Sequence, residues 1–165
     1  MRWLSKFIYY KVLGWKITGF TDVKSIKKAV IIGAPHTHWY DFPIGLLIRS
    51  VLGVRTNFIG KKGLFKWPYG WFFKALGGAP VERKSNENQV EAIARLFSEK
   101  DEFKMARAPD GTRRTVEEWR TGFYYIAKAA NVPIIMFTLD FQNKQNHFSK
   151  PFYPTDNKEA DFNFI

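Results

Sequence analysis

Apolar residues follow two alternating kinds of spacing along the chain, and this alternation predicts strands separated by helices. Short apolar runs at residues 29–34 and 132–139 have the composition of buried strands. Helices are expected at 42–52, at 87–100, where apolar side chains recur on one face, and at 123–131. Strands that alternate with helices favour an α/β fold, namely a layered α/β/α sandwich around a central, largely parallel (mixed) sheet.

Shorter elements are expected between these segments. Strands are predicted at 17–20, 55–60, 77–81 and 103–106. Asn86 is expected to cap the helix over 87–100 because its side chain can accept from a free helix N–H. The sequence after Asp140 turns polar with scattered aromatics, and it is assigned no element.

Two segments combine aromatic and basic residues. Residues 2–13 place apolar side chains on one helical face: Trp3, Leu4, Phe7, Ile8 and Val12. This helix either covers the sheet or lies in a membrane interface with its cations on anionic lipid, and both are possible if only its rim touches lipid. Residues 64–73 predict two helical turns broken at Pro68. An aromatic core explains that run most simply, although a groove for a hydrocarbon chain would use the same residues.

Composition limits the classes of protein to consider. A chain of 165 residues is long enough for one domain with a real core, so residues 1–165 are expected to form a single domain. The absence of cysteine excludes disulfides, thiolate metal sites and a cysteine nucleophile. The formal charge of +11 indicates a polyanionic surface or substrate. With 18% aromatics, both nucleic-acid stacking and membrane anchoring fit the composition.

The chain lacks any run of about 18 uncharged apolar residues, which a spanning helix needs, so we expect any membrane contact to be peripheral. The N-terminus does not resemble a signal peptide because Lys6, Lys11 and Lys16 interrupt its apolar character. A cytoplasmic protein associated peripherally with the membrane is therefore the expectation.

The first loop with chemical potential covers residues 35–41. His36 and Asp41 stand five positions apart between a predicted strand and a predicted helix. A histidine whose second ring nitrogen is held by a carboxylate is a suitable general base near neutral pH. Alternatively, Asp41 caps the helix that starts at Phe42, and His36 is a hydrogen-bonded loop residue. The loop by itself leaves both interpretations open.

The second such loop follows the strand predicted at 103–106. Gly111 permits close backbone approach, Thr112 offers a hydroxyl, and Arg113 supplies a planar guanidinium that suits phosphate. As an isolated pattern, this loop could equally be a surface turn.

Together, these loops resemble motifs of the glycerophospholipid acyltransferase family, the 1-acylglycerol-3-phosphate acyltransferases and their relatives. His36 and Asp41 match that family's His-x-x-x-x-Asp block, and residues 109–113 resemble its Pro-Glu-Gly-Thr-Arg block, which binds glycerol phosphate. Residues 78–83 are similar to a glycine-led strand that ends in an arginine, here Arg83.

A fourth block, similar to residues 132–135, completes an ordered set over roughly residues 30 to 140. The chain departs from the family pattern at Asp110, where the usual residue is glutamate, and at Pro35, Pro80 and Met136. The members that it resembles most are short bacterial ones without membrane-spanning segments.

The resemblance implies transfer of an acyl group from acyl-CoA or acyl carrier protein to the hydroxyl of a lysophosphatidic-acid-like acceptor in phospholipid biosynthesis. His36 would be the general base and Asp41 its orienting partner, with direct attack by the acceptor. The acceptor phosphate would be bound by Arg83, Asp110, Gly111, Thr112 and Arg113. No cofactor or metal is expected besides the thioester co-substrate.

Two other functions fit parts of the pattern. His36, His38 and Asp41 have a spacing that superficially resembles a metal-dependent hydrolase, although the chain contains only one further histidine, His147. Under the acyltransferase interpretation, His38 is a supporting or surface residue. The charge and the aromatics would also suit a basic nucleic-acid-binding module, but no nucleic-acid motif is present, so nucleic acid is not expected as a partner.

Overall fold

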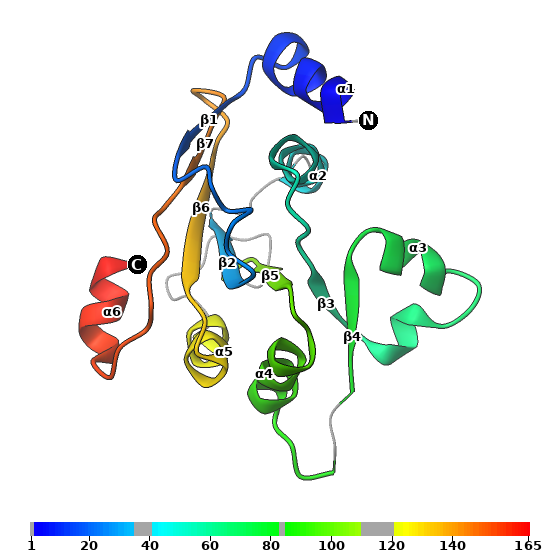
Figure 1. The fold of residues 1–165 in the computed structure, drawn as a ribbon, viewed down its shortest axis with the longest axis vertical. Helices are drawn as coiled ribbons and strands as arrows, with labels where there is room; N and C mark the ends of the chain where they lie inside the picture. The colour runs from blue at the N-terminus through cyan, green and yellow to red at the C-terminus, as the bar shows by residue number, and fades with distance from the viewer. Residues whose placement is uncertain (1, 35–40, 83–84, 110–120) are drawn as a thin grey trace.

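A five-stranded sheet forms the centre of the protein in the computed structural model, which describes residues 2–34, 41–82, 85–109 and 121–165 (Figure 1). The strands are β1 (Lys16–Gly19), β2 (Lys28–Ala34), β5 (Phe103–Arg107), β6 (Ile134–Asp140) and β7 (Gln145–Phe148), in the spatial order β1-β7-β6-β2-β5. All neighbouring pairs are parallel except β6 and β7, which are antiparallel. The predicted largely parallel, mixed sheet is confirmed.

A second, two-stranded sheet continues the β5 edge. Its strands β3 (Phe58–Lys61) and β4 (Gly78–Val81) are parallel. Asn57 joins the two sheets, because its N–H donates to the Lys104 carbonyl at 2.7 Å and its own carbonyl accepts from the Ala106 N–H at 2.8 Å. The small sheet therefore has a fixed position beside β5.

Helices cover both faces of the central sheet, as an α/β/α sandwich requires. On one face, Val30 and Ile32 of β2 pack into a core with α4 (Gln89–Glu99), α5 (Gly122–Ala130) and residues of α6 (Lys158–Phe164). On the other face, Ala29 and Ile31 pack with α2 (Asp41–Leu52). Because successive side chains of a strand point to opposite faces, the apolar run of β2 supplies both cores.

The structure corrects several details of the prediction. α4 is capped by Asn88 and not by Asn86, since the Asn88 side chain accepts from the Glu91 N–H at 2.9 Å and the Glu91 carboxylate accepts from the Asn88 N–H at 3.0 Å. Strand β7 and helix α6 occupy the region after Asp140 that was assigned no element.

The aromatic run forms the predicted two turns, η2 (Lys62–Phe65, a 3₁₀ helix) and α3 (Gly70–Ala75). Its explanation as core is wrong for most of its aromatics. The exposed large apolar side chains of this run are Leu64, Trp67, Tyr69, Trp71 and Phe72, whereas Phe65 and Phe73 are half-buried.

The N-terminal segment consists of α1 (Arg2–Phe7) and a π-helix, η1 (Ile8–Val12). No side chain of α1 is buried, and its apolar residues Trp3, Leu4 and Phe7 face solvent. Polar groups attach α1 to α2: Arg2 donates to the Val51 carbonyl at 3.2 Å, and the Ser5 and Ser50 hydroxyls lie 2.7 Å apart. The interpretation that the apolar face of this helix covers the sheet is therefore wrong for α1.

Tyr9 is the residue of the N-terminal segment that reaches the core. It is fully buried, and its hydroxyl donates to the Asn146 side-chain oxygen, while the Asn146 amide donates to the Thr138 carbonyl at 3.2 Å. Burial raises the pKa of Tyr9 far above its ordinary value, so the hydroxyl remains a donor. This bond fixes the N-terminal segment to strand β7.

The substitution Tyr9→Phe is expected to lower the free energy of unfolding by about 1–3 kcal/mol, because it leaves a buried Asn146 oxygen without this donor. Urea denaturation measures the change. Tyr10→Phe is the matched control, since Tyr10 is exposed and its hydroxyl should contribute within about 0.5 kcal/mol. Equal losses for the two variants would contradict a special role for the buried bond.

Candidate active site

The carboxyl ends of β2 and β5 lie side by side at one end of the sheet. The strands are parallel neighbours, with Ile32 paired to Arg107. After β2 the chain continues to α2 on one face, and after β5 it continues to α5 on the opposite face. In open α/β sheets, ligands bind outside the carboxyl ends of the strands at such a switch of direction. The two sequence motifs follow these same two strand ends.

Asp41 is the predicted site residue that the structure describes. It is the first residue of α2, which therefore begins one residue earlier than predicted, and it is 5% exposed. A carboxylate in the first turn of a helix is stabilised by the helix dipole. Asp41 also lines a cavity between α2 and the sheet.

The remaining predicted site residues lie outside the described residues: His36, His38, Arg83, Asp110, Gly111, Thr112 and Arg113. The structure describes the residues that precede and follow these segments, including Ile32, Asp41 and Arg107. The pairing of His36 with Asp41 and the phosphate contacts therefore stay predictions.

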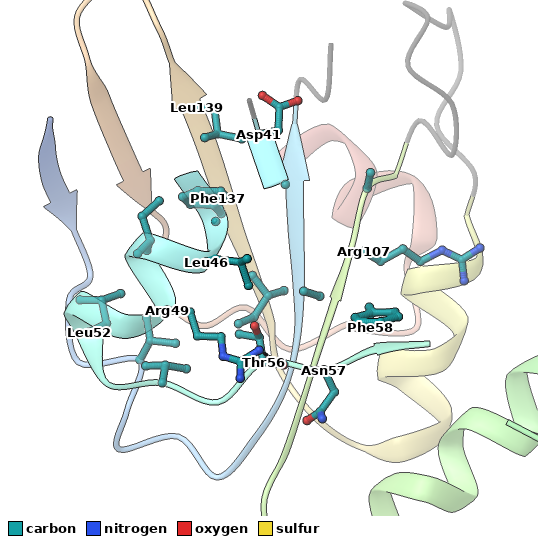
Figure 2. Close-up of a pocket in the computed structure, with 18 of the residues that line it drawn as sticks. Asp41, Leu46, Arg49, Leu52, Thr56, Asn57, Phe58, Arg107, Phe137 and Leu139 are labelled. Atoms are coloured by element: carbon teal, nitrogen blue, oxygen red, sulfur yellow. Dashed lines mark hydrogen bonds between the residues drawn. The ribbon is translucent and has the colours of Figure 1, made fainter. Parts of the chain in front are cut away.

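The cavity has a volume of about 340 Å³, within the range of roughly 300–1,000 Å³ that is usual for small-molecule sites. Its wall comes from α2, from the strands β2, β5 and β6, and from the segment between α2 and β3. Figure 2 shows Asp41 near one end, and Leu52, Thr56 and Asn57 toward the other. The lining between these ends is mainly apolar, with residues such as Leu46, Phe137 and Leu139.

The polar groups at the end remote from Asp41 are engaged with the backbone. The Arg49 guanidinium donates to the Leu76 carbonyl at 2.6 Å, and the Asn57 amide donates to the Gly77 carbonyl at 3.0 Å. A ligand in this cavity would therefore meet apolar side chains along most of its length. The arrangement suits a hydrocarbon chain whose polar end lies near Asp41.

Arg107 borders the cavity where β5 ends, although its side chain extends to the opposite face of the sheet, and the sequence interpretation did not single it out. It is the last residue of β5, and its side chain extends toward α5 in Figure 2. The Arg107 guanidinium lies beside the start of α5: a Cβ added to Gly122 would be 3.8 Å from the Nη1 atom of Arg107. One feature of the sequence could have identified it. Phe103 and Met105 alternate as apolar residues of one strand face, and Arg107 stands where a third apolar residue is expected.

Fold and site define an α/β protein with a switch of connection direction between β2 and β5, a buried carboxylate at a helix start and an adjoining apolar cavity. A family model described as Acyltransferase matches residues 15–139. The chain therefore belongs to the acyltransferase family, and the resemblance to glycerophospholipid acyltransferases is confirmed. Neither the curated proteins nor the solved structures include a significant match.

Among the described residues, no group of three or more histidines, aspartates or glutamates is placed to hold a metal ion. In the same ranges, none of the helices has the length and apolar content needed to cross a bilayer.

Gly45 offers a direct test of the cavity. It lines the cavity from α2, and a Cβ added to it meets no atom within 4 Å, so a larger side chain here would enter the empty space. Gly45→Leu is expected to weaken binding of hexadecanoate at least tenfold and to affect octanoate less. Binding is measured as the ligand-induced rise in Tm.

Gly45→Ala is the matched control, because it adds one methyl group and favours the helix by about 0.4–1 kcal/mol. It should be at least as stable as the parent protein and should still bind hexadecanoate. If Gly45→Leu bound hexadecanoate as tightly as Gly45→Ala does, the cavity would not be the site of the hydrocarbon chain.

Proposed function

We propose that this acyltransferase moves a fatty acyl group from acyl-CoA or acyl carrier protein to the free hydroxyl of a lysophosphatidic-acid-like acceptor in phospholipid biosynthesis. The observation that carries the proposal is the apolar cavity with Asp41 at one end. A fatty acyl chain in this cavity would have its thioester carbonyl near Asp41, which belongs to the His-x-x-x-x-Asp motif. Membership of the acyltransferase family supports the reaction class.

The proposed chemistry begins with His36 as general base. The imidazole takes the proton of the acceptor hydroxyl as its oxygen attacks the thioester carbonyl carbon. The new C–O bond gives a tetrahedral intermediate, which collapses with cleavage of the C–S bond. The thiolate leaves and receives the proton from the imidazolium. Asp41 orients the imidazole, and no side chain is acylated, so the substrate hydroxyl replaces the serine of a catalytic triad.

The acceptor phosphate would lie across the carboxyl ends of β2 and β5 from the acyl chain. Arg113 and Arg83 are the proposed cations, with the backbone at Gly111 and Thr112 as additional donors. The adjacent carboxyl ends of β2 and β5 support this arrangement, because the base motif follows one strand and the phosphate motif follows the other. Asp110, one methylene shorter than the family's usual glutamate, belongs to the same proposed loop.

The proposed location is the cytoplasmic surface of an anionic membrane, where acceptor and product reside. The unburied apolar residues of α1, Trp3, Leu4 and Phe7, support this proposal, together with the formal charge of +11. An amphipathic helix with such residues lies in the plane of the bilayer interface. The thioester is a co-substrate, and the proposed mechanism uses no cofactor, metal or nucleic acid.

His36→Ala and Asp41→Asn are each expected to lower kcat by about 10²–10⁴, because the first removes the base and the second its charged partner. The assay combines an acyl thioester with lysophosphatidic acid and detects the lipid product by mass spectrometry. His147→Ala is the matched control, since His147 is exposed on β7, lies 3.1 Å from Thr18 and should leave kcat unchanged. Near-native activity of His36→Ala would exclude the mechanism.

Arg113→Ala is expected to raise the KM for the acceptor by at least tenfold and to change the KM for the donor much less, since only the acceptor carries the recognised phosphate. Arg113→Lys retains the charge without the planar pair of donors, and an intermediate KM is expected. Equal increases for donor and acceptor would argue against phosphate binding by Arg113.

A further inference from the structure

The segment that contains η2 and α3, residues 62–75, exposes several aromatic side chains to solvent. Trp67 is 91% exposed and Trp71 72%, and Tyr69 and Phe72 are exposed as well. In Figure 1 this segment lies on the side of the molecule away from α6 and beyond the small sheet. We call it the η2–α3 segment.

The η2–α3 segment is anchored through Phe65. A Cβ added to Gly78 would lie 2.4 Å from the Phe65 ring, and one added to Gly60 would lie 2.9 Å from it, so this ring packs directly on the backbone of the small sheet. Gly70 packs against the Phe65 carbonyl, where an added Cβ would be 2.0 Å from the oxygen. The Phe65 ring therefore contributes to anchoring the segment on the small sheet, while the side chains of Trp67 and Trp71 are exposed to solvent.

The charges around these aromatics are mainly positive. The exposed cations of this region are Lys61, Lys62, Lys66 and Lys74. Between Asp41 and Glu82 the sequence has no acidic residue, and Glu82 pairs with Lys62 at 2.5 Å. Exposed tryptophans and a tyrosine beside lysines are the side chains that occupy the headgroup level of an anionic bilayer.

We propose that the η2–α3 segment is a second lipid-binding surface, separate from α1, which inserts Trp67 and Trp71 among the headgroups of an anionic bilayer while Lys66 and Lys74 contact lipid phosphates. A second copy of the chain is a poorer occupant, because a symmetric contact would bring like-charged lysines together. With α1 attached to α2 and this segment attached to the small sheet, the two proposed lipid contacts belong to different elements of the fold.

Site-specific labelling tests the proposal, because the chain has no cysteine and each introduced thiol is unique. An environment-sensitive fluorophore is attached to the thiol of each of three single-cysteine variants. Tyr69→Cys reports on the η2–α3 segment, Leu4→Cys reports on α1, and Lys150→Cys is a remote control. Vesicles of phosphatidylcholine with phosphatidylglycerol should shift the emission at position 69 to the blue and leave position 150 unchanged. A shift at position 4 without one at position 69 would overturn the proposal.

Vesicle cosedimentation provides a second test. Trp67→Ser/Trp71→Ser and Lys66→Glu/Lys74→Glu are each expected to weaken binding to the anionic vesicles at least tenfold. Matched controls are Tyr153→Ser, an exposed aromatic elsewhere, and Lys24→Glu/Lys150→Glu, which changes the net charge equally. If the η2–α3 variants lost no more vesicle binding than the controls, the proposal would be overturned. It would also be overturned if these substitutions left vesicle binding intact and only abolished a concentration-dependent dimer that forms without vesicles.

An assay of acyl transfer to a water-soluble, short-chain acceptor, run without vesicles, tests the proposed function independently of lipid binding by the η2–α3 segment. The η2–α3 variants should retain that activity, because their substitutions lie outside the cavity. Lipid binding is measured without donor or acceptor, so an inactive protein that still binds vesicles through position 69 would contradict the proposed function alone.

Discussion

The parallel pairing of β2 with β5 and β6 is the constraint on which the site depends. Its register places Ile32 opposite Arg107 and Ala34 opposite Thr138, so three carboxyl ends lie together at one edge of the sheet. Parallel strands require crossover connections that cover both faces, and these connections leave β2 and β5 in opposite directions. Backbone pairing alone thus brings together the two strand ends that the sequence motifs follow, before any side chain is considered.

The cavity is maintained at the expense of packing on the α2 face. Ile44, Ile48 and Val51 of α2 fill the core, whereas Gly45 on the same helix leaves open space beside them. Glycine inside a helix is unfavourable by about 1 kcal/mol relative to alanine, and an unfilled cavity forfeits dispersion contacts as well. Such a local departure from optimal packing, next to a buried carboxylate, is typical of a site that accommodates a ligand.

The sequence predicted the elements whose periodicity is set by burial on the sheet. β2 and β6 were evident because both of their faces are covered, so their apolar runs are almost continuous. β7 was missed because its four residues include polar Gln145 and His147, and because its buried Asn146 depends on Tyr9, a partner distant in sequence. The motif at His36 and Asp41 was visible as spacing, but the cavity was not, since empty space depends on how α2 lies on the sheet.

An amphipathic pattern identifies the apolar face of a helix but does not say whether that face packs into the core or is exposed. This protein contains one helix of each kind. The apolar face of α4 packs into the core through Ile93 and Phe97, as expected. The apolar residues of α1 do not, because Arg2 and Ser5 attach the opposite edge of that helix to α2. In Asp41, the two interpretations of the first loop become compatible: the first position of a helix favours a carboxylate, and a carboxylate has enough acceptor sites to serve a histidine as well. The helix start that the sequence offered as an alternative to catalysis is therefore compatible with the proposed role of Asp41 as the partner of His36.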